Sequence, residues 1–118
     1  GPHGAVFARR VFGPAEQAAL GLPLAEEEGT ARRTAHTVAS AAADFAAKEA
    51  FLKAAGTGLR EPFSLCEIEA VRLPGGAPAY HFSGRSAQWV EARRLRAHLS
   101  LSHEDGMAMA YCILETET

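Results

Sequence analysis

The sequence predicts an α+β fold in which an antiparallel sheet packs against one long, alanine-rich helix. Two patterns carry this prediction. Residues 32–55 have helical periodicity without glycine or proline, and two later segments alternate with period two around turns. The chain has 118 residues, of which 47% are hydrophobic and 22% charged, as is typical of one globular domain. We therefore expect residues 1–118 to form a single domain.

Short helical segments are expected before the long helix. Residues 5–12 place pairs of side chains at helical offsets. The Gly-Pro-Ala-Glu run at residues 13–16 then predicts a new helix start, because proline suits the first helical position and an acidic residue suits the first turn. We predict a helix over residues 14–20 and a loop over residues 21–29, which contain a proline and three consecutive glutamates.

The longest helix is predicted over residues 32–55, because alanine dominates this stretch and has the least entropic cost in a helix. Val38, Phe45 and Leu52 recur every seven residues with alanines between them, so one stripe of the helix is apolar and partly very small. Such a stripe allows close approach of a neighbouring element. The helix is expected to end at residues 56–58, where two glycines can adopt the left-handed conformation.

The second half of the chain predicts two β-hairpins separated by a helix. The first hairpin would turn at a Pro-Gly-Gly-Ala-Pro run and the second at a Glu-Asp-Gly run. The expected elements are strands over residues 65–71 and 79–82, a helix over residues 84–96, and strands over residues 98–103 and 107–114.

Charge and cysteine content exclude several classes of function. Twelve Lys and Arg residues against 14 Asp and Glu give a net charge of −2, so we expect no nucleic-acid or membrane partner. Cys66 and Cys112 are too few for a disulfide framework and lack CxxC spacing, so we predict a reducing, cytoplasmic location and no metal-thiolate site. No apolar run approaches the roughly 18–20 residues of a membrane span.

The first candidate site is a charged pair on the long helix. Glu49 and Lys53 are four residues apart, so they lie one above the other on one face, with Phe45 and Leu52 toward the core. One interpretation is a surface ion pair that contributes about 0.3–0.5 kcal/mol. The other is a site of chemistry, which the spacing alone does little to support.

Two further candidates lie in the predicted hairpins. His103 follows Leu99 and Leu101 on the apolar side of its strand, where a histidine is often a satisfied core residue and less often a ligand. The neighbouring serines form no catalytic triad, because adjacent strand residues point apart. The GGAP run at residues 75–78 lacks the lysine and helix start of a phosphate loop, which favours a hairpin turn.

Several segments occur together and in a particular order. They are FARRVFGPAEQ at residues 7–17, FAAKEAFLKAAGTGL at residues 45–59, GGAP at residues 75–78 and LSLSHE at residues 99–104. Together they closely resemble the holo-acyl-carrier-protein synthase family, the small trimeric class of 4′-phosphopantetheinyl transferases. The resemblance covers almost the whole chain. Its most specific part is the segment at residues 45–59, and it implies a phosphopantetheinyl transferase-like fold.

The resemblance implies a Mg²⁺-dependent reaction. The enzyme would move 4′-phosphopantetheine from coenzyme A to a serine of an apo acyl carrier protein and release adenosine 3′,5′-bisphosphate. Glu49 would be a catalytic residue and a Mg²⁺ ligand, and Lys53 would stabilise charge on the phosphates. The residues expected to contact coenzyme A are Lys48, Lys53, Gly76, Pro78 and His103, with Gly76 and Pro78 beside the adenine and His103 near the nucleotide phosphate.

The same resemblance implies assembly and biological context. It predicts a homotrimer whose active sites lie between subunits. It also places the enzyme in fatty-acid or polyketide biosynthesis, in the cytoplasm.

The sequence departs from the family pattern in two ways. The family begins with a strand of the form GIDIxEI whose aspartate is a second Mg²⁺ ligand, and residues 1–12 supply no match, so the single domain is expected to lack that strand. Asp44 occupies a position where the family commonly has an arginine that helps to hold coenzyme A phosphate. An alternative function is therefore a catalytically inactive structural or carrier-docking module of a larger synthase.

Overall fold

The computed structural model of the chain describes the backbone of residues 2–21 and 31–117 and the side chains of residues 6–21 and 36–117. Most of the loop expected at residues 21–29 lies outside the described residues. The elements, in order, are α1 (Pro2–Val11), α2 (Pro14–Leu20), α3 (Ala31–Ala55), the 3₁₀ helix η2 (Leu65–Glu67), β1 (Ile68–Arg72), β2 (Pro78–Phe82), α4 (Gly84–Ala92), β3 (Leu95–Glu104) and β4 (Met107–Thr116). This order confirms the predicted α+β class.

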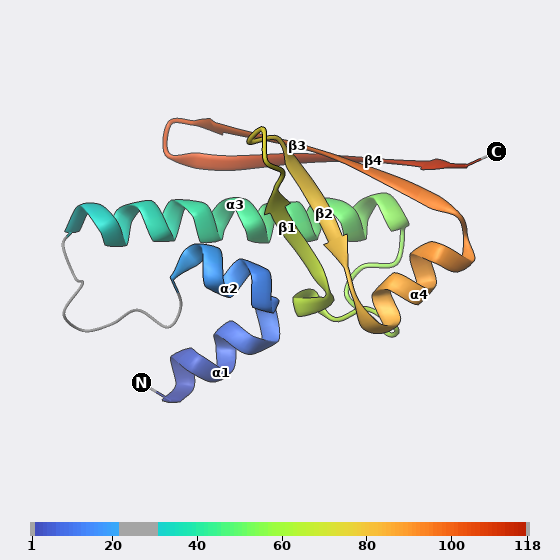
Figure 1. The fold of residues 1–118 in the computed structure, drawn as a ribbon, viewed down its shortest axis with the longest axis horizontal. Helices are drawn as coiled ribbons and strands as arrows, with labels where there is room; N and C mark the ends of the chain where they lie inside the picture. Colours follow the sequence, from blue (N-terminus) through green and yellow to red (C-terminus); the bar gives the residue numbers. More distant parts are fainter. Residues whose placement is uncertain (1, 22–30, 118) are drawn as a thin grey trace.

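Both hairpins pack on the long helix α3. Figure 1 shows the β3–β4 hairpin running along α3, while the shorter β1–β2 hairpin crosses α3 and continues from β2 into α4. Within the described residues, β1 pairs only with β2 and β3 only with β4, both antiparallel. The expected single sheet is therefore two two-stranded ladders, although β2 and β3 also contact each other.

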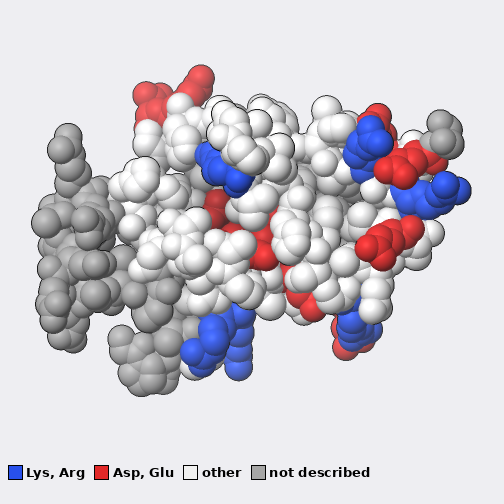
Figure 2. All heavy atoms as spheres, viewed as in Figure 1, with Lys and Arg blue, Asp and Glu red and all other residues white. Residues whose placement is uncertain are grey.

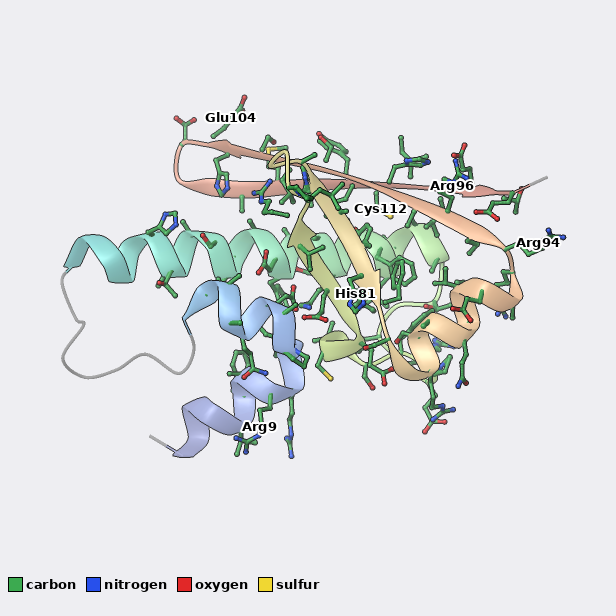
Figure 3. The ribbon with its side chains drawn as sticks, in the orientation of Figure 1. Arg9, His81, Arg94, Arg96, Glu104 and Cys112 are labelled. Atoms are coloured by element: carbon green, nitrogen blue, oxygen red, sulfur yellow. The ribbon has the colours of Figure 1, made fainter. Side chains whose placement is uncertain are left out.

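The long hairpin turns over two residues, where the sequence placed its Glu-Asp-Gly turn. Asp105 and Gly106 both have positive φ, 50° and 76°, which is the geometry that lets a tight turn match the twist of the two strands. Burial then alternates along β3 and β4, so that every second side chain faces the protein interior. Cys112 is one of the inward residues and lies between β4 and α3 (Figure 3).

The end of helix α3 agrees with the sequence prediction. Gly56 has a φ of 79°, and its N–H group donates to the carbonyl oxygens of Leu52 and Lys53 at 3.1 Å each. A left-handed glycine with this bonding satisfies carbonyls that the last helical turn leaves open. The position of the segment that begins at Gly56 is therefore fixed by the end of the helix.

Two boundaries differ from the prediction. Leu65–Glu67 forms η2 rather than strand, and the Leu65 carbonyl accepts a hydrogen bond from a lysine side chain at 3.0 Å instead of joining a ladder. Helix α4 ends at Ala92 rather than at residue 96, because Arg94 adopts a φ of 52° and redirects the chain into β3. Short runs of alternation or helical spacing do not fix such ends.

The main core surrounds Phe51 of α3, which is fully buried. Its ring packs edge-on against Phe63 at a centroid distance of 5.5 Å, and tilted against Phe82 at 4.9 Å. Trp89 of α4 packs edge-on against the rings of Phe51 and Phe63. This aromatic contact fixes the rotation of α3 about its axis. The directions of the nearby Lys48, Glu49 and Lys53 side chains on the helix are therefore defined as well.

The described surface carries mixed charge. Figure 2 shows a face that is mostly white, with a few acidic atoms and one basic group in its middle and both signs of charge interspersed near the end of β4. No helix among the described residues is long and apolar enough to cross a membrane. No strand precedes α3 in the part of the chain that the structure describes.

Candidate active site on helix α3

Glu49 and Lys53 lie on the exposed face of α3 and line the same open groove of about 530 Å³. The opposite wall of the groove comes from the segment after the helix. The other lining residues are Phe45, Leu52, Gly56, Gly58, Leu59 and Leu65. Most of this lining is apolar, so Glu49 and Lys53 supply its charge.

A second hollow of about 460 Å³ borders Glu49 and Lys53 on their other side. Its floor is the stripe of small residues on α3, including Ala46 and Ala50, and its far wall is β4 at Tyr111. The two charged side chains therefore project from a ridge between two hollows. None of the ion pairs in the described chain joins Glu49 to Lys53, which leaves both charges available to a ligand.

His103 lies in a different hollow, of about 500 Å³, at the far end of β3. The titratable side chains that line it are His36, Asp44, Arg72 and His103. His103 is exposed, so it is not the satisfied core residue of the first interpretation. Within one chain, the structure does not bring His103 to the groove of Glu49 and Lys53.

Asp44 is the half-buried anion of that hollow. Burial raises the pKa of its carboxyl to about 7, and the nearby Glu16 carboxylate adds to the increase, while Lys48 and Arg72 oppose it. The group is therefore partly neutral near physiological pH. A phosphate in this hollow would meet less repulsion than a fully ionised aspartate would cause.

Gly76 and Pro78 occupy the exposed turn between β1 and β2 and the first position of β2. Gly76 has a φ of 93°, and its N–H donates to the Leu73 carbonyl at 2.7 Å, which is the bonding of a hairpin turn. Neither residue lines the groove of Glu49 and Lys53.

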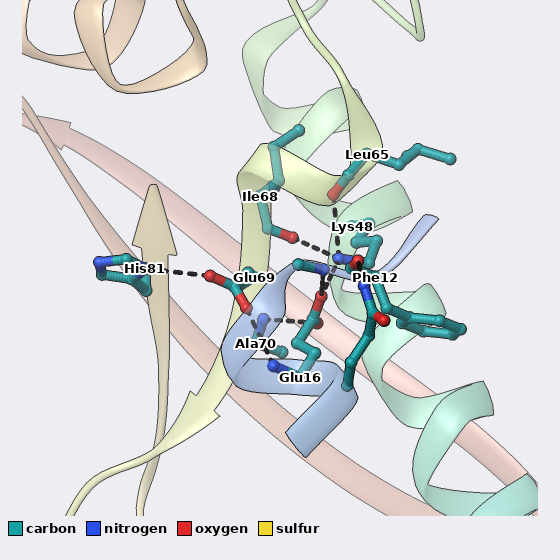
Figure 4. Close-up of polar contacts among 10 residues, drawn as sticks. Phe12, Glu16, Lys48, Leu65, Ile68, Glu69, Ala70 and His81 are labelled. Atoms are coloured by element: carbon teal, nitrogen blue, oxygen red, sulfur yellow. Dashed lines mark hydrogen bonds and ion pairs between the residues drawn. The ribbon is translucent and has the colours of Figure 1, made fainter. Parts of the chain in front are cut away.

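Lys48 differs from the expectation that it contacts coenzyme A. Its side chain is fully buried, and its ammonium lies 2.5 Å from Glu16 Oε1 and donates to the carbonyl oxygens of Leu65 and Ile68 (Figure 4). Burial lowers the pKa of this ammonium, and the Glu16 carboxylate opposes that decrease. The helix turns Lys48 inward while Glu49 faces solvent, so the two neighbours have different environments.

Two buried glutamates complete this cluster, and sequence reasoning missed both roles. Glu16 and Glu69 are 1% and 2% exposed. Glu16 also accepts from the N–H of Gly13 at 3.1 Å and of Ala70 at 2.8 Å. The sequence identified Glu16 only as a helix-start residue and Glu69 only as part of a predicted strand. Both faces of β1 are in fact buried at residues 68–70.

Glu69 links the cluster to β2. Its carboxylate accepts from the Glu16 N–H at 2.9 Å, and its other oxygen lies 3.2 Å from His81 Nδ1. His81 is exposed on β2 (Figure 3). Burial raises the pKa of Glu16, whereas the Lys48 ammonium and the bonded N–H groups favour its charged form.

Glu49 is the described residue that best fits a magnesium ligand. Its carboxylate is exposed in the groove and joins no ion pair with the side chains that the structure describes. Mg²⁺ is commonly held by one or two carboxylates together with substrate phosphates. The residues described here include no cluster of three protein side chains suited to a metal ion. The arrangement fits a metal that is completed by its substrate.

Sequence comparison gives a consistent family match. A model described as the 4′-phosphopantetheinyl transferase superfamily matches residues 1–112. A holo-[acyl-carrier-protein] synthase of Bordetella pertussis is 40% identical over 114 residues, which cover 96% of this chain and 70% of that protein. Its counterpart in Leptothrix cholodnii is 39% identical over 111 residues, which cover 94% of this chain and 80% of the relative.

Solved structures agree with the sequence match. The crystal structure of holo-[acyl-carrier-protein] synthase from Neisseria meningitidis has a TM-score of 0.77 at 31% identity, covering 96% of this chain and 82% of that one. The synthase from Bacillus anthracis, described in complex with CoA (3′,5′-ADP), has a TM-score of 0.71 at 27% identity and covers 95% and 82%.

Proposed function

Because this chain belongs to the holo-[acyl-carrier-protein] synthase family within the 4′-phosphopantetheinyl transferase superfamily, we propose that it carries out the phosphopantetheine transfer itself. The donor is coenzyme A, the acceptor is a serine hydroxyl of an apo acyl carrier protein, and the released product is adenosine 3′,5′-bisphosphate. The relatives are named as synthases, which favours an active enzyme over a structural or carrier-docking module.

One observation carries the proposal for this chain: Glu49 and Lys53 project side by side into a groove without pairing to each other. A phosphoryl transfer needs little covalent chemistry from the protein, and it depends on positioning and charge neutralisation. A carboxylate and an ammonium one helical turn apart supply both a metal ligand and a cation for phosphate oxygens.

The reaction assigns a separate task to each residue. The serine oxygen attacks the phosphorus that bears pantetheine, and the bond from that phosphorus to the bridging pyrophosphate oxygen breaks. Lys53 stabilises the negative charge that develops on the leaving phosphate. Glu49, or a water molecule beside it, accepts the serine proton. When bound at Glu49, Mg²⁺ would supply charge neutralisation on the pyrophosphate oxygens.

The nucleotide end of coenzyme A is assigned to Gly76, Pro78 and His103. We place Gly76 and Pro78 beside the adenine and His103 near the nucleotide phosphate. The hollow of His103 is separate from the groove of Glu49 within one chain, which supports a site shared between subunits. We therefore propose a homotrimer in which the groove of one subunit faces the His103 hollow of the next.

The outer face of the β3–β4 hairpin supports assembly. Alternate residues of β4 leave large apolar side chains exposed there: Met107 by 67%, Met109 by 39%, Tyr111 by 61% and Ile113 by 64%. A contiguous apolar stripe of this kind commonly marks a protein interface. Sedimentation of the purified chain tests the trimer, and Tyr111→Glu should produce a smaller species.

The proposed setting is the cytoplasm, with a carrier protein of fatty-acid or polyketide biosynthesis as the acceptor. The chain would meet both coenzyme A and the apo carrier in that compartment. The net charge of −2 favours local recognition of these partners over attraction by the whole surface.

The deciding experiment measures the mass of the carrier. The protein is incubated with coenzyme A, Mg²⁺ and several apo acyl carrier proteins, and a gain of one phosphopantetheine is the expected result. Glu49→Gln should remove the gain, whereas Glu91→Gln, the same change at an exposed position of α4, should keep it. Absence of any gain with all carriers would overturn the proposal.

A further inference from the structure

In the cluster of Lys48, Glu16 and Glu69, Lys48 joins the two elements that form the walls of the groove. Lys48 belongs to α3, which forms one wall through Glu49 and Lys53. Its ammonium donates to the carbonyl oxygen of Leu65 at 3.0 Å, and Leu65 lines the opposite wall. Figure 4 shows this side chain reaching from the helix to the segment at Leu65 and Ile68.

The contacts of Lys48 hold it in one place. Three oxygens from α2, η2 and β1 surround the ammonium: Glu16 Oε1 at 2.5 Å, the Leu65 carbonyl at 3.0 Å and the Ile68 carbonyl at 2.7 Å. An ammonium has three N–H donors, so each can be used. The described residues contain no buried side-chain polar atom without a partner. The Lys48 ammonium, which ties the two walls of the groove together, therefore has a partner for each of its donors.

Stability alone does not explain a buried cation here. Burying a charged pair costs desolvation, and apolar residues of similar volume often replace such pairs without loss of stability. Two contacts of Lys48 are to main-chain oxygens of the segment that leads from the groove wall into β1. A methionine would fill the volume but could not hold those carbonyls.

We propose that Lys48 is a positioning residue that fixes the distance between the Glu49–Lys53 wall and the Leu65 wall of the groove. Its effect on turnover rests on the proposed transferase function, but its effect on the groove does not. Because small displacements of positioned groups can cost up to about 100-fold in rate, loss of the tie should slow transfer while Glu49 and Lys53 remain intact.

The test compares three proteins that all carry Glu16→Gln and differ only at residue 48, together with one control variant. Glu16→Gln removes the charge pair and keeps the lysine on both carbonyls. Glu16→Gln with Lys48→Met removes the tie, and Glu16→Gln with Lys48→Gln leaves an amide that can donate to one carbonyl. Glu69→Gln is the control, because Glu69 belongs to the cluster but is not one of the three residues whose oxygens bond the Lys48 ammonium.

Two readouts separate positioning from stability. The first is hydrogen exchange of the free protein at the Phe63 and Glu67 amides, which bond to the carbonyls of Arg60 and Ser64. We expect about tenfold faster exchange in the Lys48→Met double variant than in Glu16→Gln. The second is steady-state kinetics, where kcat/KM should fall about tenfold in the Met variant and less in the Gln variant.

The outcomes are distinct. Equal exchange and equal kcat/KM in Glu16→Gln and the Met double variant would overturn the positioning role. The positioning role would also be overturned if Glu69→Gln had the same stability as the Met double variant and changed both hydrogen exchange and kcat/KM as much. If the Met variant does not fold, the Gln variant decides by the same comparison. If wild-type protein transfers nothing, the proposed function fails, and hydrogen exchange still decides whether Lys48 fixes the groove.

Discussion

Lys48 and Glu49 are neighbours in sequence but belong to two different regions of the molecule. Lys48 is completely buried among three oxygens, whereas Glu49 is exposed in an open groove. The rotation of about 100° between successive residues of a helix separates a structural cation from a chemically available carboxylate. The same contrast holds within one residue type, because Lys48 and Glu16 are buried whereas Lys53 and Glu49 are exposed.

The largest effect on stability is expected from removing the buried Lys48 ammonium. Lys48→Met in the wild-type background leaves the Glu16 carboxylate buried without its cation. We expect a loss of about 3–5 kcal/mol in the free energy of unfolding. Urea unfolding measures it. A loss below about 1 kcal/mol would show that Glu16 finds water or takes up a proton at little cost.

Glu49→Gln tests the exposed side. We expect kcat to fall by about 100- to 1000-fold, because the amide lacks the negative charge that the proposed mechanism uses to hold the metal and to accept a proton. The free energy of unfolding should change by less than about 0.5 kcal/mol, since the side chain is exposed. Steady-state rates and urea unfolding of the same sample provide the test, and a large loss of stability would contradict the distinction.

Asp44 is half-buried, between fully buried Lys48 and exposed Glu49. Because burial raises the pKa of its carboxyl, the effect of replacing it depends on pH. The folded-state pKa of about 7 is above the ordinary value of 3.8, so ionisation costs the folded state stability as pH rises between these values. Asp44→Asn should therefore stabilise the protein by on the order of 1–2 kcal/mol at about pH 8, after allowance for partial solvent screening.

The corresponding measurement is urea unfolding of wild type and Asp44→Asn across pH. Near pH 4 the wild-type carboxyl is mostly protonated, so the difference between the two proteins should almost disappear. A constant difference at all pH values would show that the carboxyl titrates normally in the folded state.

The smallest effect on stability is expected for Lys53→Met. The side chain is exposed and has no ion pair in the described structure, so unfolding should change by less than about 0.5 kcal/mol. Transfer should nevertheless slow by at least about tenfold, because a phosphate charge loses its cation. If stability falls as far as in Lys48→Met, then the two lysines do not differ as the structure indicates.

Sequence reasoning predicted the exposed Glu49–Lys53 pair better than the buried surroundings of Lys48. The helical spacing of Glu49 and Lys53 and the glycine end of α3 are local, and the structure has them as expected. The burial of Lys48 depends on α2 and β1 meeting the same face of α3, which periodicity cannot show. Glu69 was missed for the same reason, because alternation assumes that one face of a strand is exposed.

Helix α2 shows what such long-range contacts imply for folding. Gly13 precedes the helix, and a Cβ at this position would overlap the Glu69 side chain and the Cys66 carbonyl. The Glu69 carboxylate instead accepts from the Glu16 N–H, a contact across 53 residues of sequence. The first turn of α2 thus obtains a cap from a strand made much later in the chain. We expect α2 to be stable only after β1 has docked, and early protection of the Glu16 amide during refolding would contradict this order.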